Sequence, residues 1–321
     1  MSTLVHELGL EIELHKDVLA HSYILSCAGE KITKPFLSDV ISLLSAWKMN
    51  ISEIEKTSLK NLKAIDLKAS SGVPIDTEVL KLELMKVSND HQIDLAFMED
   101  TDGRSNKRLI VFDMDSTLIQ HEVIVEMARV FGVGDQVKHI TERAMNGEMN
   151  FDEALRERVA LLKGLKRQEM EDIQSHLKLT PGAKELIKTL KEHGYKTAIV
   201  SGGFKYFAEN FARELQMDYV FANDLEWENN VLKGTVAGEI VNAERKAELI
   251  EILAAKENIS LDQVIAVGDG ANDLLMLAKA GLGIAFHAKE KVKLTARHQM
   301  SFGPLTTILY FLGFKGDYEA L

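Results

Sequence analysis

Two hydrophobic patterns divide the chain near residue 103. Upstream, short alternating apolar runs are interleaved with segments in which apolar residues recur every three or four positions. This pattern predicts four strands and two helices in the order β-α-β-β-α-β, the split βαβ arrangement of a ferredoxin-like α+β fold. The expected strands cover residues 22–27, 51–59, 62–69 and 93–97, and the expected helices cover residues 35–47 and 77–87.

Downstream, apolar runs too hydrophobic for a half-exposed sheet alternate with helical segments, which is typical of a parallel sheet covered on both faces. We expect strands at residues 109–112, 197–200, 264–267 and 283–286. Polar, glycine-rich segments follow three of these strands, where ligands bind in open α/β sheets. The predicted fold class of this part is therefore α/β, with a Rossmann-like parallel sheet.

Two insertions interrupt this alternation of strands and helices. Residues 122–179 have helical periodicity and almost no strand signal, and they are too many for one crossover helix. We interpret them as a helical cap inserted over the ligand site. Residues 225–235, around Asn229-Asn230, predict a hairpin.

Length and composition agree with two globular domains. The chain has 321 residues, of which 46% are hydrophobic and 27% charged. The polar segment 98–107 is the predicted linker, and we place the domains at 1–103 and 104–321. The net charge of −11 argues against non-specific binding to nucleic acid or to anionic membranes.

Cysteine content and hydropathy suggest a cytoplasmic location. Cys27 is the only cysteine, so no disulfide can form within the chain, and we expect this thiol to pack as a small apolar group in a strand. No apolar run is long enough to span a membrane, and residues 1–7 lack the features of a secretion signal.

The most informative polar residues are Asp113 and Asp115, which directly follow the first downstream strand. Two carboxylates at the end of a buried strand repel each other and have left water, so a cation or a reacting group must offset them. The alternative is a polar turn in which Ser116 caps a helix. The tripeptide alone does not decide between these readings.

Further carboxylates follow the strand at 264–267, in the segment Gly268-Asp269-Gly270-Ala271-Asn272-Asp273. Together with Asp113 and Asp115, Asp269 would form an oxygen-rich site that suits Mg²⁺. Asp273 would hold its neighbours in place. The alternative for Asp269 and Asp273 is helix N-capping, the commoner role of such residues taken singly.

Two further features suit a phosphate group. Ser201-Gly202-Gly203 follows a strand and is expected to open a helix, where backbone N–H groups bind anions. Lys246 lies near the start of a predicted helix, an unfavourable place for a cation unless it faces an anion. Read singly, the first is an ordinary turn and the second a solvated surface lysine. No histidine or cysteine spacing suits zinc.

Taken together, these segments resemble the four motifs of the haloacid dehalogenase superfamily of phosphatases, in order and at suitable spacing. The resemblance covers residues 107–314 and extends, through Glu122 and the segment 149–159, to the members that hydrolyse phosphoserine. The matching motif residues are Asp113-Met114-Asp115-Ser116-Thr117, Ser201-Gly202, Lys246 and Gly268-Asp269-Gly270-Ala271-Asn272-Asp273.

The resemblance implies a mechanism for this chain. Asp113 would attack phosphorus and form an aspartyl-phosphate, and Asp115 would act as general acid and then base. Mg²⁺ would be held by Asp113, Asp269 and the backbone carbonyl of Asp115. The phosphate oxygens would be bound by a further set of residues, namely Ser201, Gly202, Lys246 and Asn272.

The resemblance also implies a substrate, O-phospho-L-serine, whose hydrolysis is the last step of L-serine biosynthesis. Glu122 would bind the ammonium group and Arg158 the carboxylate, while Met145 and Phe151 would wall the pocket. Each of the four has an ordinary alternative, as a surface charge or as part of the cap core. A phosphatase or phosphotransferase acting on another small metabolite is the alternative function.

Residues 1–103 resemble an ACT-type regulatory domain by pattern only. Such a domain could bind an amino acid such as L-serine, or it could serve only in homodimer formation or packing. We favour dimer formation or packing, because no motif in residues 1–100 marks a pocket.

Overall fold

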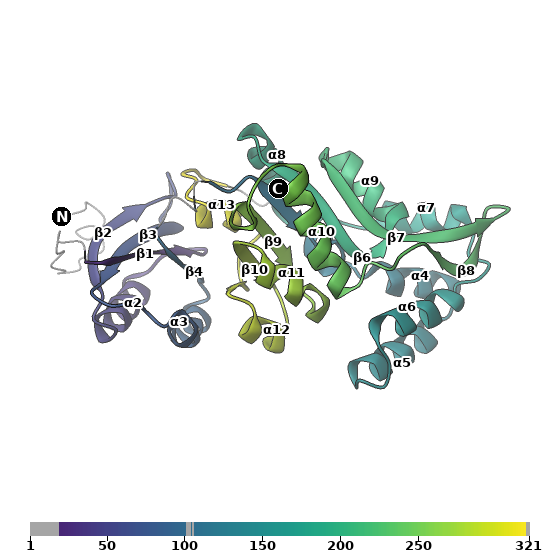
Figure 1. Ribbon diagram of the computed structural model, residues 1–321, viewed down its shortest axis with the longest axis horizontal. Helices are drawn as coiled ribbons and strands as arrows, with labels where there is room; N and C mark the ends of the chain where they lie inside the picture. Colours follow the sequence, from purple (N-terminus) through teal and green to yellow (C-terminus); the bar gives the residue numbers. More distant parts are fainter. Residues whose placement is uncertain (1–18, 101–103, 105, 319–321) are drawn as a thin grey trace.

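The computed structural model describes residues 19–100, 104 and 106–318. Two β-sheets lie side by side along the long axis of the molecule (Figure 1), an antiparallel sheet of four strands and a mostly parallel sheet of seven. We refer to residues 19–100 as the N-terminal unit and to residues 106–318 as the C-terminal unit. The predicted boundary at 103/104 falls beside residues outside the described ranges and stays a prediction, as does the absence of a signal in residues 1–7.

The N-terminal unit has the predicted β-α-β-β-α-β order, and its strands follow one another across the sheet as β2-β3-β1-β4. Cys27 is buried in β1, as expected. The connection between the second and third strands is longer than predicted, because the Ser58 hydroxyl accepts hydrogen bonds from the backbone of Lys63 and Ala64 and closes a wider loop. The elements are β1 (His21–Ala28), α2 (Lys34–Ala46), β2 (Asn50–Lys56), β3 (Ala64–Ser71), α3 (Thr77–His91) and β4 (Asp94–Glu99).

The C-terminal unit contains the predicted parallel sheet, with strands in the order β11-β10-β9-β5-β6-β7-β8. The four predicted strands are present, and the structure adds β11 and a parallel first half of β7. The first three residues of that strand, 219–221, pair with residues 198–200 before the strand turns into the hairpin. The strands are β5 (Leu109–Phe112), β6 (Lys196–Phe204), β7 (Tyr219–Glu228), β8 (Val231–Ala237), β9 (Val264–Gly268), β10 (Leu282–Phe286) and β11 (His298–Met300).

The segment 122–179 is helical, as predicted, and lies at the end of the molecule far from the N-terminal unit (Figure 1). Its four helices are α4 (Val123–Phe131), α5 (Gly134–Met145), α6 (Phe151–Ala160) and α7 (Arg167–His176). The remaining helices of the unit are α8 (Ala183–Glu192), α9 (Lys205–Leu215), α10 (Ala243–Lys256), α11 (Leu274–Lys279), α12 (Glu290–Thr295) and α13 (Thr307–Phe311). Within the described ranges, no helix is both long enough and apolar enough to cross a bilayer.

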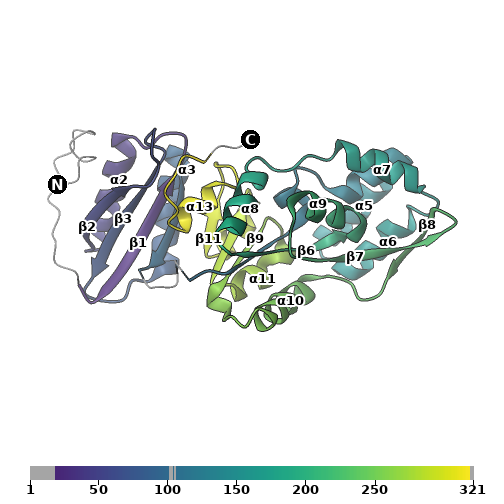
Figure 2. The same ribbon diagram turned by 90° about the horizontal axis from the view of Figure 1, so that it is seen from above.

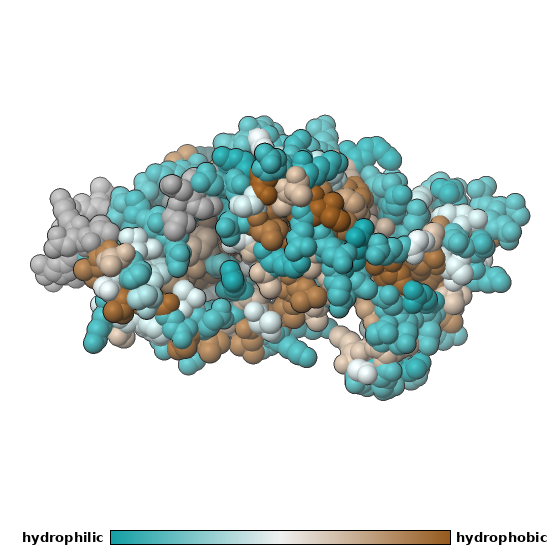
Figure 3. Space-filling model, viewed as in Figure 1, coloured by the Kyte–Doolittle hydropathy of each residue, from teal (hydrophilic) through white to brown (hydrophobic). Residues whose placement is uncertain are grey.

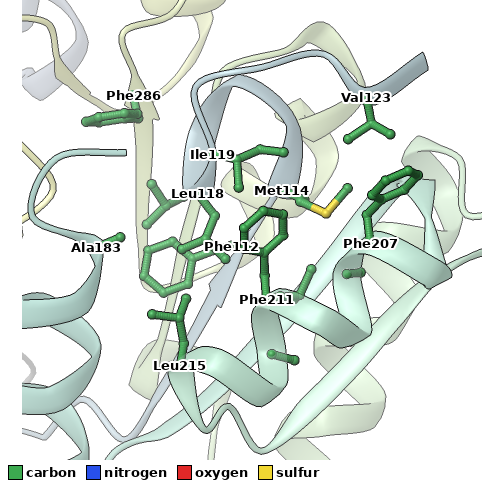
Figure 4. Packing of buried hydrophobic residues seen from close by; sticks show 14 of the residues in the cluster. Phe112, Met114, Leu118, Ile119, Val123, Ala183, Phe207, Phe211, Leu215 and Phe286 are labelled. Atoms are coloured by element: carbon green, nitrogen blue, oxygen red, sulfur yellow. The ribbon is translucent and has the colours of Figure 1, made fainter. Parts of the chain in front are cut away.

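The core of the C-terminal unit fixes the end of its central strand. Phe112, the last residue of β5, is fully buried and lies near Met114 and near Phe207 and Phe211 of α9 (Figure 4). Burial of one such side chain contributes roughly 1.5–3 kcal/mol. Residue 113 therefore projects from a rigid platform.

On the face shown in Figure 3, apolar residues form separate patches within a mainly hydrophilic surface.

The two units lie against each other (Figure 2), and buried polar contacts join them. The Asp94 carboxylate of β4 is buried and accepts hydrogen bonds from the backbone N–H groups of Ser301 (2.6 Å), Phe302 (3.2 Å) and Gly303 (2.7 Å). Three donors to one buried carboxylate make a strong attachment, because hydrogen bonds to charged groups are worth about 1.5–3 kcal/mol each.

A second attachment involves Arg104, in the segment between the two units. The Arg104 guanidinium donates to the Asp66 carboxylate at 2.8 Å and to the backbone oxygens of Tyr310 and Phe311. The carboxylate of Asp317 accepts from the backbone of Leu59 and Lys60. The N-terminal unit is therefore packed against the C-terminal unit at several separate points.

His298 lies where the edge strands β4 and β11 meet. Its Nε2 donates to the Phe97 carbonyl at 3.1 Å. Burial lowers the pKa of the imidazole from 6.5 to about 4, although two backbone hydrogen bonds oppose this shift. The folded protein therefore holds His298 neutral under conditions in which the unfolded chain would protonate it.

We expect His298 to make the stability of the protein pH-dependent. Its contribution is fully present above pH 6.5, because neither state is then protonated, and is lost as the pH falls through about 4. Between pH 7.5 and 5, urea denaturation should show the wild type losing about 2 kcal/mol more unfolding free energy than His298→Gln. Equal pH slopes for the two proteins would contradict this assignment.

Candidate active site

The site lies at the carboxyl ends of β5, β6 and β9, at the point where the order of strands reverses: β6 and β7 are added on one side of β5, and β9 to β11 on the other. β5 is central, paired in parallel with β6 on one side and β9 on the other. In open α/β sheets a crevice forms at such a point, because successive connections leave in opposite directions. The segments after these three strands, which the sequence marks as polar and glycine-rich, converge there.

The turn after β5 aims two carboxylates into this crevice. The Asp113 Oδ1 accepts the backbone N–H of Met114 at 2.7 Å, and the chain then reverses through Ser116, which has a φ of 54°. The Ser116 hydroxyl donates to Glu122 at 2.7 Å, which ties the turn to the start of the cap. Ser116 therefore does not act as the helix cap considered from the sequence.

Asp115 is partly buried in the crevice. Its Oδ1 accepts from the backbone N–H of Val123 at 3.2 Å, and its Oδ2 faces Gly203 so closely that a Cβ there would collide with it. Burial raises the pKa of Asp115 well above its usual value, and the nearby Glu122 and Asp113 charges raise it further. These effects favour the protonated form of this carboxyl group.

Lys246 is completely buried, which excludes the surface reading of this residue. Its Nζ lies 2.9 Å from Asp113 Oδ1 and 2.7 Å from Asp273 Oδ1. These two carboxylates raise the pKa of the ammonium group despite its burial, so Lys246 stays charged. Its helix, α10, begins at Ala243, so one turn of helix places the charge directly behind Asp113.

An acidic cluster remains beside this ion pair. One carboxylate oxygen from each of Asp113, Asp269 and Asp273 lies within 4.8 Å of the others. Burial and the charges of Asp113, Asp273 and Glu122 raise the pKa of Asp269 to about 8, although the Thr117 hydroxyl donates to it at 3.1 Å. Such mutual destabilisation of oxygen donors fits a site built for a hard divalent cation.

Within that cluster the roles of the carboxylates differ. Asp273 accepts hydrogen bonds from both Lys246 and the Gly270 backbone N–H (2.9 Å), so both its oxygens are engaged. Asp269 has the Thr117 contact on one oxygen only. Asp269 therefore keeps the more open oxygen, and the roles expected of Asp269 and Asp273 stay predictions.

A small cavity of about 120 Å³ opens over these groups, between the sheet and the cap. The predicted site residues on its walls are Asp113, Asp115, Glu122, Phe151, Arg158, Gly202, Asp269 and Asn272. Met145 is not among the lining residues; it ends α5 and is 65% exposed, so the geometry gives its predicted role no support. A larger cavity, about 890 Å³, lies between the two units and carries no predicted site residue.

The segment Ser201–Gly203 differs from the sequence interpretation. These residues continue β6 in extended conformation, and α9 begins only at Lys205. The pairing of β6 with β7 shifts between Val200 and Phe204, so this segment bends out of the sheet. Ser201 is buried beside the cavity, where its Oγ accepts the Gly203 N–H at 2.9 Å and keeps its own proton to donate.

The cap contributes a charged wall opposite the sheet side of the cavity. Arg158 is partly buried, its Nε donates to the Ala154 carbonyl at 3.1 Å, and no described carboxylate pairs with it within 4.0 Å. Burial lowers the pKa of its guanidinium, an effect opposed by the nearby Glu122 and Asp115. Glu122 lies on the same cavity, so this wall presents one anion and one cation.

Sequence reasoning missed several apolar residues of the pocket. Leu155 and Ile124 line it from the cap and Phe204 from the end of β6. Leu155 follows Phe151 by one helical turn, so the face of α6 that carries Phe151 and Arg158 would have indicated it. No sequence signal marks Phe204, because its place depends on the bend in β6.

Comparisons with known proteins give matches to the C-terminal unit and to the whole chain. Residues 107–281 match the model of the haloacid dehalogenase-like hydrolase family. A phosphoserine phosphatase of Archaeoglobus fulgidus is 54% identical over 213 residues, covering 66% of this chain and 62%, less than two thirds, of that protein.

Two similarities extend over both units. A phosphoserine phosphatase of Mycobacterium tuberculosis, SerB2, is 38% identical over 327 aligned residues, which cover 100% of this chain and 80% of that protein. The unliganded crystal structure of a probable phosphoserine phosphatase from Vibrio cholerae matches with a TM-score of 0.75 and 33% identity, over 94% of this chain and 90% of that one. The N-terminal unit therefore belongs to the shared architecture.

We expect Lys246→Met to destabilise the protein strongly. The substitution keeps the apolar stem but leaves Asp113 and Asp273 buried without their cation, at a cost of about 3–5 kcal/mol of unfolding free energy. Urea denaturation in buffer with a chelator measures this loss. Lys188→Met, at an exposed position on α8, is the matched control and should change stability by less than about 0.5 kcal/mol. Equal effects would refute the central role of Lys246.

Proposed function

The chain belongs to the haloacid dehalogenase-like hydrolase family, and from that premise we propose that it hydrolyses O-phospho-L-serine to L-serine and phosphate. The observation that carries the proposal is the charge arrangement of one small cavity. Its sheet side holds Asp113 and Asp269, with Lys246 directly behind, and its cap side holds Glu122 and Arg158. Phosphoserine has a phosphate at one end and an ammonium and a carboxylate at the other.

Substrate selection falls to the cap. No carboxylate of the described residues pairs with Arg158 within 4.0 Å, so its planar fork is open to the substrate carboxylate as a bidentate pair. Glu122 binds the substrate ammonium, and its other contact, the Ser116 hydroxyl, holds it in place. Phe151 and Leu155 exclude water from the rest of the pocket.

Asp113 is the nucleophile. Its Oδ1 is occupied by the Met114 N–H and by Lys246, which leaves Oδ2 to attack phosphorus. The bond from phosphorus to the serine oxygen breaks, and that oxygen takes a proton from Asp115, whose raised pKa suits a general acid. An aspartyl-phosphate and free L-serine result.

The second half of the reaction reverses the role of Asp115. As a carboxylate it accepts a proton from water, and the water oxygen attacks the phosphorus of the aspartyl-phosphate. The bond to Asp113 breaks and inorganic phosphate leaves. Throughout, Lys246, the Ser201 hydroxyl and the Gly202 segment hold the phosphate oxygens, with Asn272 on the same cavity wall.

The metal of this site is proposed to be Mg²⁺, held by Asp113, Asp269 and the backbone carbonyl of Asp115. Bound there, it would neutralise charge between the nucleophile and the phosphate. The oxygen-only donor set and the raised pKa of Asp269 support a hard divalent cation.

The setting of the reaction completes the proposal. We place it in the cytoplasm as the last step of L-serine biosynthesis, and we expect no nucleic-acid or membrane partner at a net charge of −11. The N-terminal unit contributes packing against the C-terminal unit. Homodimer formation and L-serine binding by this unit stay predictions.

Asp113→Asn tests the nucleophile. Because an amide cannot form the acyl phosphate, phosphate release from phosphoserine should fall at least about 10³-fold. Rapid acid quench with ³²P-phosphoserine should trap labelled wild-type protein and no labelled variant. Asp135→Asn, exposed on the cap, is the control and should leave turnover unchanged. Robust turnover by Asp113→Asn would exclude this nucleophile.

The metal is tested on the wild type. Its turnover of phosphoserine should stop with EDTA and return with Mg²⁺.

Arg158→Ala tests substrate recognition. On phosphoserine, kcat/KM should fall by about 10² or more, because a charge-assisted pair with the carboxylate is lost. O-phosphoethanolamine keeps the phosphate and ammonium groups but lacks the carboxylate, so its slow turnover should change less than about threefold. Arg156→Ala, exposed on the same helix, is the matched control. Equal losses on both substrates would disprove the carboxylate contact.

A further inference from the structure

A buried asparagine joins two segments that flank the active site. Asn223, on β7, has no exposed surface. Its Nδ2 donates to the Gly202 carbonyl at 2.8 Å, and its Oδ1 accepts the Val241 N–H at 2.8 Å. Both ends of one side-chain amide are therefore used, and the phosphate-binding segment is tied to the residues that lead into α10.

Asn242, which follows Val241 in the chain, connects these two joined segments to the cap. It is the N-cap of α10, where its Oδ1 accepts the Arg245 N–H at 3.0 Å and its backbone oxygen accepts the Lys246 N–H at 2.9 Å. Its Nδ2 donates to the Asp152 carboxylate at 3.1 Å. Asp152 lies in α6, 90 residues earlier in the chain.

The contact occurs beside a close approach of the cap to β6. Asp152 follows Phe151, whose ring packs on Gly202 so closely that a Cβ there would lie 2.9 Å from Cζ. The same α6 carries Arg158 two turns further on. One hydrogen bond thus links the helix that carries Arg158 to the residue that starts the helix of Lys246 (Figure 1).

We propose that Asn242 and Asp152 are a positioning pair that holds the cap closed over the substrate and, through the N-cap of α10, sets Lys246 behind Asp113. Asn223 holds the backbone before Asn242 in place through its hydrogen bond with the Val241 N–H. Neither partner touches the reacting atoms. The proposal rests on the proposed function only for its choice of substrate.

The test exchanges the two partners. Asn242→Asp keeps an acceptor for the Arg245 N–H, so α10 stays capped, but it sets one carboxylate against another across the cap contact. We expect KM for phosphoserine to rise at least tenfold and kcat to fall. In the double variant Asp152→Asn with Asn242→Asp, the amide donates from the cap side, so both constants should return to within about threefold of wild type.

Asn229→Asp, at the exposed tip of the β7–β8 hairpin, adds the same charge away from the contact and should behave as wild type. Urea denaturation should give similar unfolding free energies for all variants. Wild-type constants for Asn242→Asp, or no recovery in the double variant, would overturn the proposal. If the wild type rejects phosphoserine but hydrolyses another phosphate monoester, the substrate assignment fails, and the same exchange measured with that ester decides for or against the pair.

Discussion

The buried ammonium of Lys246 between Asp113 and Asp273 is the interaction on which the site depends. Two carboxylates this far from water cannot stay ionised unless a cation offsets them, and a surface lysine could not reach them. The lysine must therefore start from a helix that approaches from behind the central strand. The placement of α10, and of the asparagine that caps it, follows from this electrostatic requirement.

This single cation leaves the site electrostatically incomplete. Asp269 and Asp115 still have raised pKa values, since Lys246 is engaged with the other two carboxylates. The remaining negative charge attracts a divalent cation. It also raises the pKa of a neighbouring carboxyl group, and a general acid needs that raised pKa to keep its proton. A fully neutralised site would be more stable and would have no use for either, so the instability is a property of the function.

The sequence predicted the sheet, the cap and the motif residues, because these depend on local patterns. Phe112 and its strand are apolar enough to be buried on both faces, and the carboxylates follow at once. Local pattern is not enough where tertiary contacts decide. Lys246, read singly, has the pattern of a surface lysine, and only the family resemblance singled it out. The sequence failed at two points: the helix after Ser201 begins late because β6 bends, and Met145 has a helical pattern that fits cap surface as well as pocket.

Asn223 and Asn242 are residues whose tertiary contacts the sequence does not indicate. An asparagine within a strand or at a helix start carries no sequence signal beyond its local role, and Asn242 does fulfil such a role as an N-cap. Its second hydrogen bond, to a helix 90 positions earlier, exists only in the folded chain. The reacting groups of this protein therefore lie in short sequence motifs. The alignment of the cap side of the cavity with its sheet side depends instead on side-chain amides whose partners are remote in the chain.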